Sequence, residues 1–226
     1  GKYIERDINK AIHYYSLAAD QNNRDAQYNL ATIYKEGKFI ERDINKAIHY
    51  YSLAADQNDP QAQLNLGFFY IEGIYVERDI NKAVHYLSLA ANQNIVEAQF
   101  NLGLFYSDGK YIKPDINKAI HYFQLAANQN YLEALYDLGL IHHAGKYGKR
   151  DIKKAIHYYS LVANQNIPEA QFNLGIIYSG REYVERDINK AIHYFSLAAN
   201  QNLPEAQIGL GNIYYEGKQV ERDINK

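Results

Sequence analysis

The sequence predicts an all-α solenoid made of six copies of one 36-residue unit. The stretch 43–58, DINKAIHYYSLAADQN, returns at a constant spacing along the chain. Its copies begin at Asp7, Asp79, Asp115, Asp151 and Asp187, and a further start stands at Asp223. Repetition at one fixed period is typical of proteins whose units pack mainly on their neighbours. Each unit contains two segments with apolar residues at helical spacing, which indicates a pair of helices.

Composition narrows the classes of function. The formal net charge is −2 with acids and bases interspersed, so the chain offers no basic stripe, and we expect no nucleic acid partner. No apolar run approaches the roughly 20 residues that a membrane span needs, so no membrane insertion is expected. The absence of cysteine excludes thiolate metal sites and agrees with a reducing compartment such as the cytoplasm, without establishing one. Because the chain has no methionine, we expect it to be a segment of a longer protein.

The first helix of the second copy, helix A, is expected over residues 25–36. Leu30, Ile33 and Tyr34 recur at helical spacing, and Gly37 follows where a left-handed C-terminal cap is expected. The opposite side of helix A is also largely apolar in most copies, so we expect helix A to be covered nearly all round, as the inner layer. The residues of that side are Tyr28, Thr32, Leu64, Phe68, Phe100, Leu104, Phe172 and Ile176.

The second helix, helix B, is expected to begin after Asp43. The carboxylate of Asp43 can accept hydrogen bonds from the free backbone N–H groups of the first turn. Ala47, Tyr51 and Ala54 form one apolar stripe, so only one side of helix B should be buried. Asn58 then suits a left-handed cap, and the pair Gln-Asn closes helix B in all six copies. The sequence has prolines at positions 60, 168 and 204. They are expected at or near the first turn of the next helix A, where the missing N–H of proline costs nothing.

A pair of short helices is too small to bury a core alone, so stability must come from neighbouring repeats. Small residues are expected where helices approach closely, at Ala31, Gly67, Gly103, Gly139, Gly175 and Gly211. The chain is therefore expected to form one array over residues 1–226. Its parts are a helix B half-repeat over 1–22, full repeats over 23–58, 59–94, 95–130, 131–166 and 167–202, and a truncated repeat over 203–226.

The repeat resembles the Sel-one-like repeat, a relative of the tetratricopeptide repeat. In the third copy the matching residues are Ala62, Leu66, Gly67, Tyr70, Gly73, Asp79, Lys82, Ala83, Tyr86, Ala90 and Ala91. The resemblance implies a right-handed superhelix of antiparallel helix pairs, with helix A on the concave side and helix B on the convex side. It also implies a non-enzymatic scaffold for protein complexes, with no cofactor.

Some positions depart from the family pattern. Asparagine ends each helix B where the family often has glycine. The fifth full repeat, 167–202, has Gly180 and Arg181 where others have an acid and glycine, and the fourth full repeat, 131–166, has His142 and Gly148 at the usual tyrosine and valine or isoleucine positions. We expect these changes to affect local geometry and to leave the fold intact.

The first candidate binding row lies one residue before the core leucine of helix A. It consists of Asn29, Asn65, Asn101, Asp137 and Asn173, with Gly209 in the last copy. Side-chain amides carry a donor and an acceptor, so such a row can pair with the backbone of an extended peptide. The alternative is that each asparagine ties neighbouring structural elements together.

The second candidate row is the most variable one on the expected binding face. It consists of Lys35, Ile71, Ser107, His143, Ser179 and Tyr215. A module that binds a protein or an extended peptide should concentrate chemical differences on that face, whereas a structural spacer attached to another domain has no reason to. Both functions stay open from the sequence.

A third row pairs histidine with leucine on the outer side of helix B. Its members are His13, His49, His85, His121, His157 and His193, with Leu17, Leu53, Leu89, Leu125, Leu161 and Leu197. Neighbouring helices lie about 8 to 10 Å apart, too far for histidines of adjacent repeats to share an ion, so no metal site is expected. We expect the histidine rings to cover the leucines of a solvated face. Lateral self-association through the leucines is the alternative.

The fourth copy departs from the pattern at several positions together, namely Leu135, Asp137, His142, His143 and Lys149. Sequence drift or a binding spot could explain this. No nucleophile or oxyanion arrangement accompanies Asp137 and His143, so no catalytic residue is predicted. Finally, the chain begins with a helix B and ends with a helix A, so we expect a possible head-to-tail stacking of a monomer, limited by overlap between residues 1–10 and 217–226.

Overall fold

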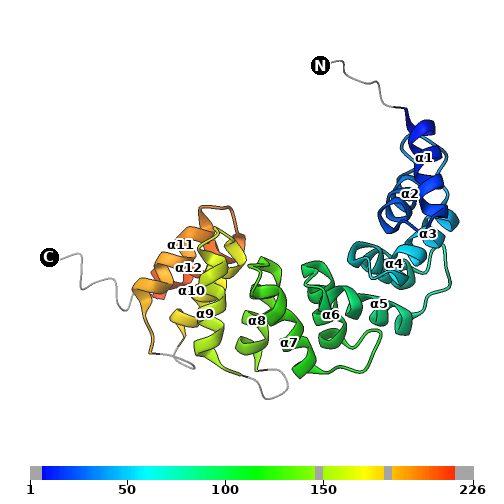
Figure 1. The fold of residues 1–226 in the computed structure, drawn as a ribbon. Helices are drawn as coiled ribbons and strands as arrows, with labels where there is room; N and C mark the ends of the chain where they lie inside the picture. The colour runs from blue at the N-terminus through cyan, green and yellow to red at the C-terminus, as the bar shows by residue number, and fades with distance from the viewer. Residues whose placement is uncertain (1–6, 146–149, 181–184, 217–226) are drawn as a thin grey trace. The chain divides into compact units, whose positions relative to one another are not determined.

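The computed structural model describes residues 7–145, 150–180 and 185–216 (Figure 1). Its contacts divide the chain into two compact units, Gly1–Leu125 and Ala126–Lys226, which we call unit 1 and unit 2. Within the described residues the secondary structure is entirely helical, and no strand is present. The all-α prediction is therefore confirmed.

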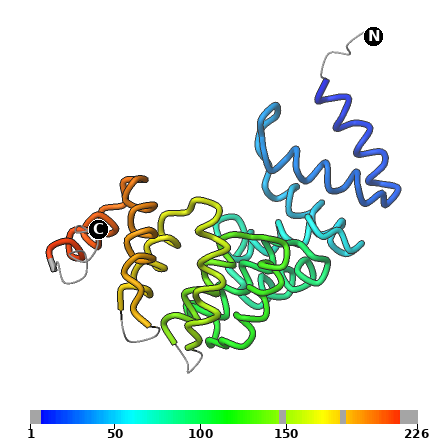
Figure 2. Tube along the Cα trace, turned by 90° about the vertical axis from the view of Figure 1, so that its left-hand side faces the viewer, coloured from blue at the N-terminus to red at the C-terminus, as the bar shows by residue number. Residues whose placement is uncertain are grey.

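The helices alternate between the two predicted types. The helices A are α2 (Arg24–Glu36), α4 (Pro60–Glu72), α6 (Val96–Asp108), α8 (Leu132–Ala144), α10 (Pro168–Ser179) and α12 (Pro204–Glu216). The helices B are α1 (Ile8–Asp20), α3 (Ile44–Asp56), α5 (Ile80–Asn92), α7 (Ile116–Ala127), α9 (Ile152–Ala163) and α11 (Ile188–Ala199). Unit 1 contains α1 to α6 and α7 up to Leu125, and unit 2 contains α8 to α12. The Cα trace in Figure 2 follows the helices of each unit.

The predicted caps of helix B are confirmed. The Asp43 carboxylate accepts a hydrogen bond from the backbone N–H of Lys46 at 3.0 Å, and Asp7, Asp79, Asp151 and Asp187 do the same in their copies. These backbone bonds favour the charged carboxylate and lower the pKa of Asp7, Asp43 and Asp187. At the other end, the six asparagines of the Gln-Asn pairs have φ between 60° and 64°, the left-handed conformation.

The ends of helix A follow the prediction in four copies and depart from it in the fifth. Gly37, Gly73, Gly109 and Gly145 have φ between 61° and 70°. Gly180 has φ −80° and ψ 167°, so α10 ends without a left-handed cap. Three other departures from the family pattern lie outside the described residues, namely Gly148, Lys149 and Arg181.

Close approach of helices explains the row of small residues. A Cβ added to Gly103 would lie 2.5 Å from the ring of Phe123, which is 1% exposed. Gly67, Gly139 and Gly175 receive Leu87, Tyr159 and Phe195 in the same way. Among the described residues nothing lies within 4 Å of a Cβ added to Gly211, so the prediction is not confirmed there. The residues that follow α12 are outside the described part of the chain.

The expectation that helix A is covered nearly all round is also wrong. Leu140 on α8 is 39% exposed and Ile176 on α10 is 41% exposed, while Phe68 and Leu104 are partly buried. A helix A packs on both the preceding and the following helix B, as α10 does on α9 and α11. The following helix B covers part of the predicted opposite side, since the rings of Phe172 and Phe195 have centroids 5.7 Å apart. Leu140 and Ile176 remain at the surface.

Candidate functional site

The surface side of helix A brings both candidate binding rows together. In α8 the residues of this side are Glu133, Asp137, Leu140 and His143, at spacings of four, three and three. Such spacings keep the side chains within about a third of the helix circumference. We call the set of these positions on the helices A the helix-A face. It includes the asparagine row, the row from Lys35 to Tyr215, and the exposed apolar residues between them.

In unit 1 the two rows touch across a repeat boundary. Lys35 on α2 donates a hydrogen bond from Nζ to Oδ1 of Asn65 on α4, at 2.5 Å. The amide nitrogens of Asn65 and Asn101 donate to carbonyl oxygens of their own helices, those of Gln61 and Glu97, at 2.7 Å. Asn29 is half-buried. Asn65 and Asn101 thus use their donors within their own helices and stay half-buried.

In unit 2 the asparagine row contains one asparagine that bonds another helix and one aspartate. Asn173 on α10 donates from Nδ2 to the hydroxyl of Tyr136 on α8, at 3.1 Å. Asp137 occupies the equivalent place on α8. Burial first, and then the neighbouring charge of Glu133, raises the pKa of Asp137 to about 6. Asn173 therefore ties two helices together, as the structural alternative expects, and ligand binding by the row stays a prediction.

The second row differs in chemistry from copy to copy. Ser107 and Ser179 donate to carbonyl oxygens of their own helices, at 3.0 and 2.9 Å. The ring of His143 meets that of Tyr159 edge-on, with centroids 5.9 Å apart. Ile71 packs against the apolar cluster around Leu87, and Tyr215 is 94% exposed.

A row of buried glutamines carries a polar network that our sequence reasoning missed. Gln27, Gln63, Gln99 and Gln171 on the helices A are at most 1% exposed. Each donates to the carbonyl oxygen of an alanine eight residues earlier, at the end of the preceding helix B. The glutamine of a Gln-Asn pair donates to three of them, from Gln57 to Gln27, from Gln93 to Gln63 and from Gln201 to Gln171, at 2.7 to 2.9 Å. Leu135 stands in this row in the fourth copy and packs in an apolar cluster of unit 2. The sequence feature that could have revealed this row is the glutamine that follows the core alanine of helix A in most copies.

In the row of histidines and leucines on the helices B, the histidines lie in solvent. All six histidines are exposed, and each ring lies edge-on against the tyrosine that follows it, with centroids 5.2 to 5.3 Å apart. The histidines thus contact tyrosines, where we expected leucines. Leu17 and Leu161 are exposed, and Leu53, Leu89 and Leu125 are half-buried. In the described part of the chain, no group of three or more His, Asp or Glu side chains could hold a metal ion.

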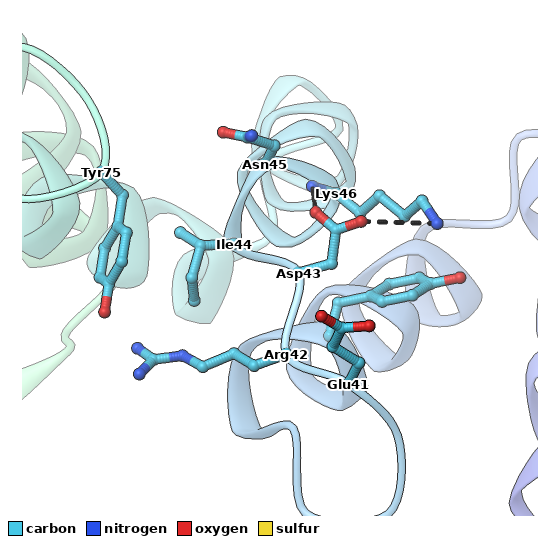
Figure 3. A pocket seen from close by; sticks show the side chains of 8 residues that line it. Glu41, Arg42, Asp43, Ile44, Asn45, Lys46 and Tyr75 are labelled. Carbon is cyan, nitrogen blue, oxygen red and sulfur yellow. Dashed lines mark hydrogen bonds and ion pairs between the residues drawn. The ribbon is translucent and has the colours of Figure 1, made fainter.

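Hollows of about 550 Å³ lie where helix B begins, at the loop edge of unit 1 (Figure 3). In the first, Lys46 lies 3.5 Å from Asp43 and 4.9 Å from the centre of the Tyr34 ring. Arg42 lies 5.0 Å from the centre of the Tyr75 ring, on the next loop. An equivalent hollow surrounds Asp79 and Lys82 in the next copy. The charges here are engaged within the protein, which indicates that this edge joins successive repeats.

None of the described helices is long and apolar enough to span a membrane.

Comparisons with known proteins agree with this architecture. The chain is 31% identical to a protective antigen of uropathogenic Escherichia coli strains with an SLR fold, with a TM-score of 0.76 over 95% of this chain and 46% of that one. This chain thus spans about half the length of that antigen. It is also 31% identical to a Sel1 repeat protein from Oxalobacter formigenes, with a TM-score of 0.67 over 88% of this chain and 81% of that one. No curated protein matches the chain.

The Sel1 repeat model matches the whole sequence in seven consecutive segments. The segments are 1–23, 24–59, 60–95, 96–131, 132–167, 168–203 and 204–226. These matches confirm the resemblance drawn from the repeated motif, and the chain belongs to the Sel1 repeat family.

Proposed function

We propose that this protein is a non-enzymatic scaffold that holds an extended segment of a partner protein on its helix-A face. Sel1 repeat proteins generally act as protein-interaction scaffolds and are typically non-catalytic. The observation that carries the proposal is the exposure of Leu140 and Ile176, at 39% and 41%, on the side of the helices A that no helix B covers. Apolar side chains that stay exposed at the same position of successive repeats are typical of an interaction surface.

The polar residues around this apolar row support an extended ligand. Asn65 and Asn101 keep their amides on the surface while their donors bond within the helix. The acceptor of Asn101 can meet an N–H group of a bound backbone, whereas that of Asn65 already accepts from Lys35, and the apolar row can hold alternate side chains. The variable residues from Lys35 to Tyr215 then adjust selectivity from one repeat to the next.

Affinity capture from a lysate of the source cells tests this function. A Leu140→Lys variant should lose partners that the wild type retains. Leu161→Lys is the matched control, because Leu161 has the same 39% exposure but lies on α9, a helix B of the same unit. Equal retention by both variants would contradict the proposal.

A structural spacer is the second candidate. The glutamine network favours it, because it links the ends of successive helices B through a buried side chain and so stiffens the array. In a spacer, neither Leu140→Lys nor Leu161→Lys changes the set of captured proteins.

Association between copies of the chain remains a separate proposal. The lateral version uses Leu53, Leu89, Leu125 and Leu161, and light scattering of a Leu89→Lys, Leu125→Lys variant tests it. The head-to-tail version stacks the first helix B on the last helix A and is limited by overlap between residues 1–10 and 217–226, of which 1–6 and 217–226 lie outside the described residues. A particle mass that does not rise with concentration would contradict both versions.

A further inference from the structure

We infer that the helix-A face of unit 2 takes a basic partner segment, which places a lysine or arginine beside Asp137 and an apolar side chain on Leu140 and Ile176. This inference rests on the proposed function, because it names the partner chemistry of the same face. It commits to a protein segment that carries positive charge next to apolar residues.

The apolar part of the surface spans two neighbouring helices. Leu140 and Ile176 occupy equivalent positions on α8 and α10, which lie in the same unit (Figure 1). The hydrogen bond from Asn173 to Tyr136 joins these helices one turn away from the two apolar residues. The pair can therefore receive an apolar side chain that crosses from one helix to the next.

The acidic part lies beside it, toward the N-terminal ends of the same helices. Glu133 is four residues before Asp137 and exposed, and Glu169 holds the equivalent exposed place on α10. In unit 2 the sequences of α8, α10 and α12 contain no lysine and no arginine. A row of acids without a lysine or arginine on the same helices is complementary to a positively charged ligand, and the histidines of α8, His142 and His143, lie in its last turn.

The arginines nearest to these helices lie at their opposite end. Arg150 and Arg186 donate to the carbonyl oxygens of Ala144 and Ser179, at the C-terminal ends of α8 and α10. From residue 133 to residue 144 a helix rises by about 16 Å, which is twice the screening length of about 8 Å at physiological ionic strength. These arginines therefore leave the charge of Glu133 largely uncompensated, while Asp137 lies about 10 Å along the helix from residue 144, just beyond one screening length.

In unit 2, two lysines of the described residues form ion pairs with aspartates at the start of the helices B. Lys154 and Lys190 lie 3.9 and 3.2 Å from Asp151 and Asp187. At the start of the chain the situation differs, because Arg24 bonds Asp25 and Lys35 bonds Asn65 on the helix-A face itself. Glu97 on α6 also stands on a helix without lysine or arginine, so the carboxylate of Asp137 is what sets unit 2 apart.

Asp137 is the residue that distinguishes this part of the face. The equivalent position holds asparagine in Asn65, Asn101 and Asn173. The change from amide to carboxylate adds a charge in a half-buried place, where burial raises the pKa. A cation bound beside Asp137 would stabilise the charged carboxylate, which burial disfavours.

Selection from a phage-displayed library of random linear peptides tests the inference. The library is selected on the whole chain, and the peptides obtained are titrated against the wild type and three variants by fluorescence anisotropy. Peptides with lysine or arginine next to apolar residues should be enriched. Their affinity should fall about tenfold in Leu140→Lys and about fivefold in Asp137→Asn, and stay unchanged in Leu161→Lys.

The outcomes separate this inference from the proposed function. Asp137→Asn introduces the residue found in four other copies, so circular dichroism should show an unchanged fold. If the selected peptides depend on Leu140 but are acidic or uncharged, or if Asp137→Asn binds basic peptides as tightly as the wild type, the preference for a basic segment is overturned and the scaffold stands. If no peptide depends on Leu140, both proposals are overturned.

Discussion

Gln57, at the end of α3, donates a hydrogen bond from Nε2 to Oε1 of Gln27 on α2, 2.7 Å away. The same nitrogen bonds Oδ1 of Asn22, which ends the preceding helix B. The buried Gln27 in turn donates toward the end of α1, to the carbonyl oxygen of Ala19. A buried amide with both its donor and acceptor engaged thus connects the ends of two successive helices B.

Gln93→Ala tests the contribution of this network to stability. Gln93 donates to the fully buried Gln63, so its removal leaves the acceptor of Gln63 without that partner. We expect the free energy of unfolding to fall by about 1 kcal/mol. The midpoint of urea unfolding, followed by circular dichroism, measures the change.

Gln21→Ala is the matched control for that variant. Gln21 occupies the same position in the first copy but donates to Leu17 of its own helix, on the surface. We expect a change within about 0.5 kcal/mol. Equal shifts in both variants would mean that the bond between the repeats adds nothing.

The network also shows a limit of the sequence reasoning. The constant period and the capping residues were enough to predict the order of helices, because Asp43 and Asn58 specify local backbone geometry through their own side chains. A glutamine specifies no local geometry. Its role depends on which carbonyl oxygens and amides the packed repeats bring around it, and a polar letter such as Gln63 does not reveal burial.

Gly103→Ala tests the close approach of α6 and α7. The added Cβ would lie 2.5 Å from a ring atom of Phe123, and this ring is buried and cannot move aside. Overpacking of this kind costs about 1 to 3 kcal/mol, which exceeds the gain in helix propensity from alanine. We therefore expect a lower midpoint of thermal unfolding.

Gly211→Ala is the corresponding control on α12. The added methyl group meets nothing within 4 Å, so only the propensity gain of about 0.5 to 1 kcal/mol remains. A stabilised Gly211→Ala together with a destabilised Gly103→Ala is the expected pair of results. The same sign of change in both would contradict the close-packing explanation.

Asp137→Asn should alter the pH dependence of stability. Burial and Glu133 raise the pKa of Asp137 to about 6, so between about pH 4 and about pH 6 the folded chain holds more proton on this residue than the unfolded chain. The free energy of unfolding of the wild type therefore falls as the pH rises through this range. Asparagine removes the effect, and we expect the variant to be more stable by about 1 kcal/mol at neutral pH, after allowance for solvent screening.

Thermal unfolding of both proteins across this pH range measures the difference. The charged and titratable groups around Asp137 are Glu133 on its own helix, Tyr136, Tyr159 on α9 and Glu169 on α10. The carboxylates of Glu133 and Glu169 and the two tyrosines are kept in both proteins, so the comparison isolates Asp137. A stability difference that does not shrink toward about pH 4 would contradict the assignment.

The surface side of helix A illustrates what periodicity cannot supply. Leu140 and Ile176 are residue types typical of a core, and the apolar pattern around helix A predicted burial on nearly all sides. Burial depends on how many layers of helices the repeats form, and the preceding and following helices B together leave part of helix A at the surface. The positions of Asn65 and Asp137 on that surface could be predicted from helical spacing, but the hydrogen-bond partners of these residues could not.

Asn173→Ala and Asn101→Ala separate the structural and ligand-binding roles of the asparagine row. Asn173 bonds Tyr136 on another helix, so its removal should cost about 1 kcal/mol. Asn101 bonds only Glu97 of its own helix, and alanine has the higher helix propensity, so the stability of that variant should stay the same or rise. Urea unfolding midpoints measure both changes. If Asn101→Ala keeps its midpoint but weakens the binding of a captured partner, its amide serves the ligand. Unchanged binding together with a lowered midpoint would make the whole row structural.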